Sequence, residues 1–223
     1  MSRLRAVIVV LSLAAACRDH AAAQAPAGTY VVVATWQETA TTIPPGAWIE
    51  PSGIDVGPSG RIYVADRRLR RIEVLDPGGS PLRSFGRGTS PEDLVAPEHL
   101  AVDEARDRLY VADAGASRIA VYDTSGNRLA LWSGVGTPCG VAVAPDGRVA
   151  ITDAAASRVH VLDPSGTRVA TWGDGSAGQP ELDQPGGLDV TTDGEVWVAD
   201  RGNARLVAAT LGGRQTDDLS LGA

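Results

Sequence analysis

The stretch Ile62-Tyr-Val-Ala-Asp66 decides the fold, because the chain repeats it three more times. The copies are Leu109-Tyr-Val-Ala-Asp113, Val149-Ala-Ile-Thr-Asp153 and Val196-Trp-Val-Ala-Asp200. Each copy is a short β-branched and aromatic run of the kind that forms strands. A motif that recurs at a regular interval is the signature of a repeat architecture.

Outward from this motif, the similarity extends over a whole module. Each copy is preceded by a run that begins with proline, and the intervals between Pro51, Pro97, Pro138 and Pro185 are 46, 41 and 47 residues. Two more strand-like runs follow each copy, and turn sequences rich in Gly, Pro, Asp and Ser separate the runs. Four short antiparallel strands in roughly 40 to 50 residues are typical of one blade of a β-propeller.

These modules resemble the repeats of the NHL-repeat β-propellers, whose blades carry Pro-x-Gly-hydrophobic-Ala-Val, Tyr-Val-Ala-Asp and Arg-Ile-x-Val. The resemblance covers about residues 28–210 and implies an all-β fold of four-stranded antiparallel blades. Propellers of this family usually have six blades. This sequence has four blades, at residues 51–96, 97–137, 138–184 and 185–223. An N-terminal strand and its linker precede them, at residues 24–50.

We therefore expect an incomplete or open ring. We expect such a ring to form dimers or aggregates through its edges. Truncation of a six-bladed protein and closure with fewer blades are the alternatives. Unpaired edges of a sheet are prone to self-association. The residues at strand ends, Phe85, Trp132 and Trp172, are expected to pack between blades.

Residues 1–23 predict an export signal. The apolar run 6–16 follows a short basic region and is too short to span a bilayer. The small residues 21–23 suit cleavage by signal peptidase, whereas Leu13-Ala-Ala-Ala-Cys17 resembles a bacterial lipobox with Cys17 as the lipidated residue. We expect a periplasmic or secreted protein, or alternatively one held at a membrane by a lipid on Cys17.

Composition excludes one class of partner. The 223 residues include 20 basic residues, all arginine, against 27 acidic ones, for a formal net charge of −7. An acidic chain without a basic run after its leader lacks the charge that nucleic-acid binding requires. Besides Cys17, Cys139 is the only cysteine, so no disulfide within the chain is expected.

The repeated aspartates are interpreted as structural. Each is followed five residues later by an arginine, which gives the pairs Asp66 and Arg71, Asp113 and Arg118, Asp153 and Arg158, and Asp200 and Arg205. We expect each carboxylate to accept the backbone amides of the following turn and to pair with its arginine. A catalytic site needs different groups at one place, not the same group in every blade.

Candidate binding residues are those at which one repeat differs from the others. After the leading proline, the four modules read Ser-Gly, Glu-His, Cys-Gly and Gly-Gly, so Glu98, His99 and Cys139 stand out at the mouth of the central channel. Carboxylate, imidazole and thiolate are zinc ligands; ordinary loop variation is the other interpretation. Asp55 and Asp189 replace alanine in mid-strand and could pair around Ca²⁺, or be neutral. The sequence requires no cofactor.

We interpret the chain as an exported binding or scaffold module for a protein, peptide or glycan partner, with the rim and the connections 87–98 and 173–184 as the binding loops. The alternative is a metal-dependent enzyme, since the resemblance extends to amidating lyases, which it links to zinc and calcium, and to calcium-dependent lactonases. The lyase interpretation requires several histidine ligands, and the propeller part of the sequence has only His99 and His160. No nucleophile elbow, phosphate-binding glycine loop or CxxC pair is present.

Overall fold

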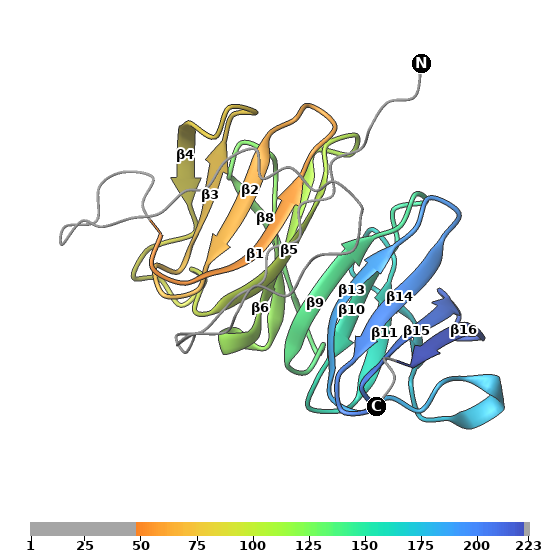
Figure 1. The fold of residues 1–223 in the computed structure, drawn as a ribbon. Coiled ribbons are helices and arrows are strands. Elements are labelled where there is room, and N and C mark those ends of the chain that lie inside the picture. Colours follow the sequence, from red (N-terminus) through yellow and green to blue (C-terminus); the bar gives the residue numbers. More distant parts are fainter. Residues whose placement is uncertain (1–47, 221–223) are drawn as a thin grey trace, which may run out of the picture.

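The computed structural model describes residues 48–220 and holds four separate sheets of four antiparallel strands. In each sheet the strands lie in chain order, so every sheet is one blade (Figure 1). The blades are, in order: β1 (Pro51–Val56), β2 (Ile62–Asp66), β3 (Arg71–Leu75), β4 (Pro81–Phe85); β5 (Pro97–Asp103), β6 (Arg108–Asp113), β7 (Arg118–Tyr122), β8 (Arg128–Ser133); β9 (Pro138–Val143), β10 (Val149–Asp153), β11 (Arg158–Leu162), β12 (Arg168–Trp172); β13 (Pro185–Val190), β14 (Glu195–Asp200), β15 (Arg205–Thr210), β16 (Gln215–Ser220).

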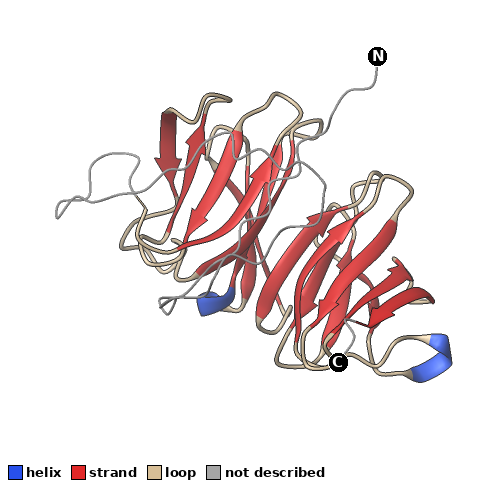
Figure 2. Ribbon diagram, in the orientation of Figure 1, coloured by secondary structure: helices blue, strands red, loops and turns tan. Residues whose placement is uncertain are grey.

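The predicted all-β propeller of four-stranded blades is confirmed. Apart from strands and loops, the described residues hold only two single turns of 3-10 helix, η1 (Ala114–Ala116) and η2 (Ser176–Gly178) (Figure 2). Within residues 48–220 no helix is long and apolar enough to cross a membrane. The predicted leader with Cys17, and residues 24–47 of the predicted N-terminal strand, lie outside the described residues.

The first strand of each blade lies innermost, and β1, β5, β9 and β13 follow one another side by side. The blades fan out from these strands, and the fourth blade does not return to the first, so the ring is open as predicted (Figure 1). This arrangement gives each blade a forward face, toward the next blade in the chain, and a rear face, toward the preceding one.

Two rows of cross-strand neighbours form each forward face, because side chains alternate between the faces of a strand. In blade one, Ala65, Ile72 and Phe85 share one row, and Tyr63 and Val74 share the other. These side chains form one apolar cluster with the rear face of blade two. Equivalent clusters join blades two and three and blades three and four, with Trp132 and Trp172 in the positions of Phe85. The aromatic strand ends therefore pack between blades, as predicted.

Polar contacts join blade one to blade two near the C-terminal ends of β1 and β5. Asp55 on β1 accepts a hydrogen bond from the Val102 amide of β5, with 2.7 Å from Oδ2 to N. In the turn after β5, Glu104 accepts hydrogen bonds from the Ser59 amide at 2.8 Å and the Ser59 hydroxyl at 2.6 Å. Such bonds fix the register of one blade on the next, while the apolar clusters supply most of the driving force.

Candidate functional site

The two ends of the blades differ, and we name them by their loops. The turn face carries only tight hairpins, such as 57–61 and 123–127. The loop face is the end where the inner strands begin. It carries the two long connections between blades, 86–96 and 173–184, and the loops between the second and third strands. Glu98 and Cys139 lie at this end because each follows the proline that begins an inner strand.

The repeated aspartates hold the connections of the loop face in place. In each blade the buried carboxylate accepts the amide of a residue just before the inner strand of its own blade. The distances are 2.7 Å from Asp66 to Ile49, 2.8 Å from Asp113 to Ala96, 3.1 Å from Asp153 to Thr137 and 2.8 Å from Asp200 to Asp183. Asp66 and Asp153 also accept amides of the turn that follows them. Each aspartate thus fastens an incoming connection, and Asp66 and Asp153 also fasten the turn that follows them. Asp113 makes no side-chain bond to its following turn, so the predicted turn-capping role is not shared by all four.

The arginines five residues later are the cross-strand neighbours of these aspartates in all four blades. Arg118 contacts Asp113 at 3.1 Å and Arg205 contacts Asp200 at 2.8 Å, both with carboxylates that are fully buried. In blade one, the guanidinium of Arg71 lies 3.2 Å from Glu73. The position of Glu73 holds Ala120, His160 and Val207 in the other blades, so this carboxylate is particular to blade one.

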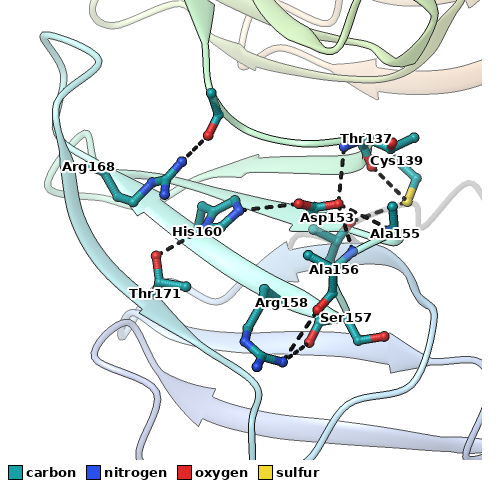
Figure 3. A network of polar contacts seen from close by, with 12 residues as sticks. Thr137, Cys139, Asp153, Ala155, Ala156, Ser157, Arg158, His160, Arg168 and Thr171 are labelled. Carbon is teal, nitrogen blue, oxygen red and sulfur yellow. Dashed lines mark hydrogen bonds and ion pairs between the residues drawn. The ribbon is translucent and has the colours of Figure 1, made fainter.

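Blade three departs furthest from the expected pairing. Arg158 lies 3.9 Å from Asp174, and its place beside Asp153 is taken by His160, whose Nε2 is 3.5 Å from Oδ2 (Figure 3). The other ring nitrogen, Nδ1, lies 3.0 Å from the hydroxyl of Thr171. Burial lowers the pKa of His160, and nearby Arg168 lowers it further, while Asp153 opposes the shift. A neutral imidazole thus sits between a carboxylate and a hydroxyl.

Glu98 reaches across to blade one. Its carboxylate lies 3.1 Å from Nε of Arg67, which also lies 3.6 Å from Glu50. Arg67 is half-exposed, so this is a surface network of the kind that contributes little stability but shapes the charge of a surface. The sequence analysis did not single out Arg67. The feature that could have pointed to it is the cluster of four arginines within residues 67–71, the densest positive charge in this acidic chain.

His99 follows Glu98 near the start of β5 and is partly buried. Its Nδ1 is buried without a hydrogen-bond partner among the described residues. Burial lowers the pKa of His99, and the carboxylates of Asp55 and Asp189 oppose the shift. Asp55 and Asp189, on the inner strands of blades one and four, therefore lie near enough to His99 to act on its charge.

Cys139 contacts the next blade in the same way as Ser52 does in blade one. Its Sγ lies 3.4 Å from the Pro185 carbonyl of the next blade, and the Ser52 hydroxyl donates to the Pro97 carbonyl at 2.7 Å in the same way. Burial raises the pKa of the Cys139 thiol. A thiol that is kept protonated is a poor nucleophile and metal ligand. We therefore interpret Cys139 as a structural contact between blades three and four.

Within residues 48–220, no group of three or more His, Cys, Asp or Glu side chains that could hold a metal ion is found. The zinc set Glu98, His99 and Cys139 and the calcium pair Asp55 and Asp189 stay predictions. Both carboxylate oxygens of Asp55 already accept backbone amides, from Val56 and Val102, each at 2.7 Å. A cavity of about 400 Å³ lies at the turn face, beside Asp146 and Asp193, away from all of these residues.

Comparisons with known proteins agree with this architecture. Residues 182–208, which span β13, β14 and most of β15, match the NHL repeat model. No curated protein matches the chain by sequence. Similar solved structures include a streptogramin B lyase (18% identity, TM-score 0.62, covering 82% of this chain and 57% of the other) and a nidogen/laminin complex (24% identity, TM-score 0.65, 80% and 66%). A hydrazine synthase from Kuenenia stuttgartiensis is also similar (16% identity, TM-score 0.61, 85% and 52%).

The prediction of an NHL-type β-propeller is thereby confirmed. Identities this low show the fold alone, and the chain spans less than two thirds of each of these solved chains. The number of blades in a complete ring stays a prediction.

Proposed function

We propose that this chain is an exported binding module that takes up a protein partner on its loop face. One observation carries the proposal: both long connections, 86–96 and 173–184, lie at the same end of the blades as Glu98 and Arg67, whereas the turn face has only tight hairpins. Loops held on a rigid sheet scaffold are a common way to present binding residues.

The charges of the loop face suit a polar partner. Arg67, Arg68 and Arg70 are exposed on the loop between β2 and β3, and exposed Glu92 and Glu181 lie on the two long connections. Mixed exposed charge of this kind sets specificity and association rate more than affinity. The likeness to a nidogen chain solved in complex with laminin supports a protein partner; peptides and glycans are the alternatives. The leader-like residues 1–23 support export to the periplasm or medium, or lipid attachment at Cys17.

The experiment compares matched charge reversals at the two ends. Wild type, Arg68→Glu with Glu92→Arg on the loop face, and Arg148→Glu on the turn face are immobilised and exposed to envelope and secreted proteins from the source cells. Proteins that are retained by wild type and by Arg148→Glu, but lost from the loop-face variant, support the proposal. Equal retention by all three proteins would contradict it.

The second candidate is a metal-dependent enzyme, favoured by the buried Nδ1 of His99, which has no hydrogen-bond partner among the described residues. Zinc or calcium bound in fixed stoichiometry by wild type and lost in His99→Ala would support that alternative. Equal metal content in both proteins would leave His99 with a role in packing.

A further inference from the structure

The forward face of blade four is built like the other forward faces, but no described blade covers it. Its two rows hold Ala199, Leu206 and Leu219, and Asp189, Trp197, Ala208 and Asp217. In blade one, the same positions hold Ala65, Ile72 and Phe85, and Asp55, Tyr63, Val74 and Arg83. Blade four therefore repeats the apolar pattern that elsewhere meets a following blade.

The large side chains on the forward face of blade four are exposed, whereas their equivalents in the preceding blades are buried. Tyr63 in blade one is 0% exposed and Tyr110 in blade two is 1% exposed, whereas Trp197 at the same position is partly exposed. Trp172 in blade three is 1% exposed, whereas Leu219 at the same position is 50% exposed. An exposed apolar patch of this kind marks an interaction site.

The backbone of β13 also leaves room for a neighbouring strand at Gly187. A Cβ on Gly53 would lie 2.7 Å from His99 Cα of the next blade, and one on Gly140 would lie 2.9 Å from the Gly186 carbonyl of the next blade. At Gly187, in the same position of blade four, a Cβ would meet no described atom within 4 Å. In blades one and three this glycine lets the inner strands of adjacent blades approach closely. Blade four has the same glycine, but no described strand of a following blade lies beside it.

Asp189 repeats the local geometry of Asp55. Each accepts the amide of the next residue, at 2.8 Å from Val190 and 2.7 Å from Val56. Asp55 also accepts the Val102 amide of the following blade, and Asp189 is exposed at the corresponding point. The position is suited to accept a backbone amide from an incoming strand.

The opposite end of the array has an apolar rear face, of which Ile62 and Val64 are already buried, at 6% and 5% exposed. On blade one, Val56 and Ile62 share one row and Ile54 and Val64 share the next, in the positions through which blades two to four receive the preceding blade. Trp48 and Ile54 pack against Ile62 and Val64, while Val56 beside them is 42% exposed. Both ends of the described array are therefore apolar.

The two ends also differ in charge. Residues 51–85 of blade one hold six arginines and four acidic residues, for a net charge of +2, whereas residues 185–220 of blade four hold three arginines and six acidic residues, for a net charge of −3. These totals count every side chain of each blade, and four of the six arginines lie within 67–71. Opposite net charge on two blades steers their encounter at long range. Two forward faces of blade four meeting each other would instead bring Asp189 and Asp217 of both copies together.

We propose that the forward face of blade four binds the rear face of blade one of a second copy of this chain. The contact is head to tail, so two copies that satisfy both ends form a closed pair, and copies that satisfy one end at a time extend into a row. Twice four blades lies within the roughly four to eight blades of known propellers. This contact uses the two ends of the array and is independent of the loop face.

Sedimentation equilibrium of the full chain tests the proposal. Leu219→Glu alters the blade-four end and Val56→Glu the blade-one end, both at exposed side chains where folding is retained. Leu129→Glu is the matched control, because Leu129 is 47% exposed on the outer strand of blade two and lies outside both ends. Each end variant is expected to associate at least about tenfold more weakly than wild type and the control.

Mixing the variants identifies the geometry. Leu219→Glu keeps an intact blade-one end and Val56→Glu keeps an intact blade-four end, so their equimolar mixture is expected to form one-to-one dimers that neither variant forms alone. A Val56→Glu variant that still dimerises would overturn the head-to-tail contact, because the copies would then meet through two forward faces. A wild type that stays monomeric at all concentrations would overturn self-association altogether. Near-ultraviolet circular dichroism, with Leu219→Ser as a milder variant, excludes loss of folding as the cause.

Discussion

The Asp55 carboxylate accepts the Val102 amide across the junction of blades one and two, at 2.7 Å. Asp189 occupies the equivalent place in blade four and accepts only the amide of its own neighbour Val190 among the described residues. One residue type at one repeat position thus joins two blades in the first case and marks an open end in the second.

Asp55→Ala is expected to lower the free energy of unfolding by about 1 to 3 kcal/mol, because it leaves the Val102 amide without its acceptor. Asp189→Ala, the matched control, removes no bond between described blades and should change stability by less than about 0.5 kcal/mol. Urea unfolding of both monomeric proteins measures the difference. Equal losses would mean that the bond across the junction does not stabilise the fold.

Asp113→Ala is expected to be the more severe change, with a loss of about 3 to 5 kcal/mol, because it leaves the largely buried Arg118 without its carboxylate. It also removes the acceptor of the Val95 and Ala96 amides. Asp123→Ala, in an exposed hairpin turn, provides the comparison and should cost no more than about 1 kcal/mol. Similar losses for both variants in thermal unfolding would contradict a special role for the repeated aspartates.

Gly140→Ala is expected to destabilise the protein by about 1 to 3 kcal/mol, because the added methyl would press on the backbone of blade four. Gly187→Ala should be neutral or slightly stabilising in the monomer, since a Cβ there has space and alanine restricts the unfolded chain. Denaturant midpoints of the two variants, measured at a concentration that keeps them monomeric, give the comparison. A clear loss for Gly187→Ala would show that this strand is already in contact with other parts of the chain.

His160 should make stability depend on pH. Burial lowers its pKa below the ordinary value, so the folded protein favours the neutral ring. The contribution of His160 to the stability of the fold is complete above the pKa of the imidazole in the unfolded chain, about 6.5. It is lost as the pH falls from there toward the lower pKa of the folded protein. His160→Gln should flatten the fall in stability between neutral and mildly acidic pH, as measured by urea unfolding at several pH values.

The variant His99→Gln should be measured by the same urea unfolding at several pH values, because burial also lowers the pKa of His99. Each single variant should remove part of the slope, and the double variant more than either. An unchanged slope in His160→Gln would show that its protonation is not coupled to folding.

The repeat pattern predicted the blades because the same residue types recur at the same strand positions. Tyr63, Tyr110 and Trp197, for example, were recognisable as equivalent, and their shared face follows from the alternation of side chains along a strand. The tight turns were equally predictable, since Asp and Gly have a physical preference for them.

The partners of individual charged groups were less predictable. Arg158 and Asp153 are cross-strand neighbours, yet His160 lies beside Asp153, because Asp174 on the following connection offers Arg158 another carboxylate. Glu98 lies beside Arg67 on the preceding blade, a contact that depends on how two blades are turned against each other. Such choices rest on geometry between modules, which a pattern within one module does not contain.

The aspartate that fastens each incoming connection has an evolutionary consequence. In every blade the carboxylate holds a backbone amide that lies one or two residues before its own module, at the end of the preceding segment. Because any residue except proline has such an amide, a module that gains a different predecessor can fasten it in the same way. Blade number in such chains can therefore change by recombination, since each copy brings the carboxylate that holds the connection leading into it.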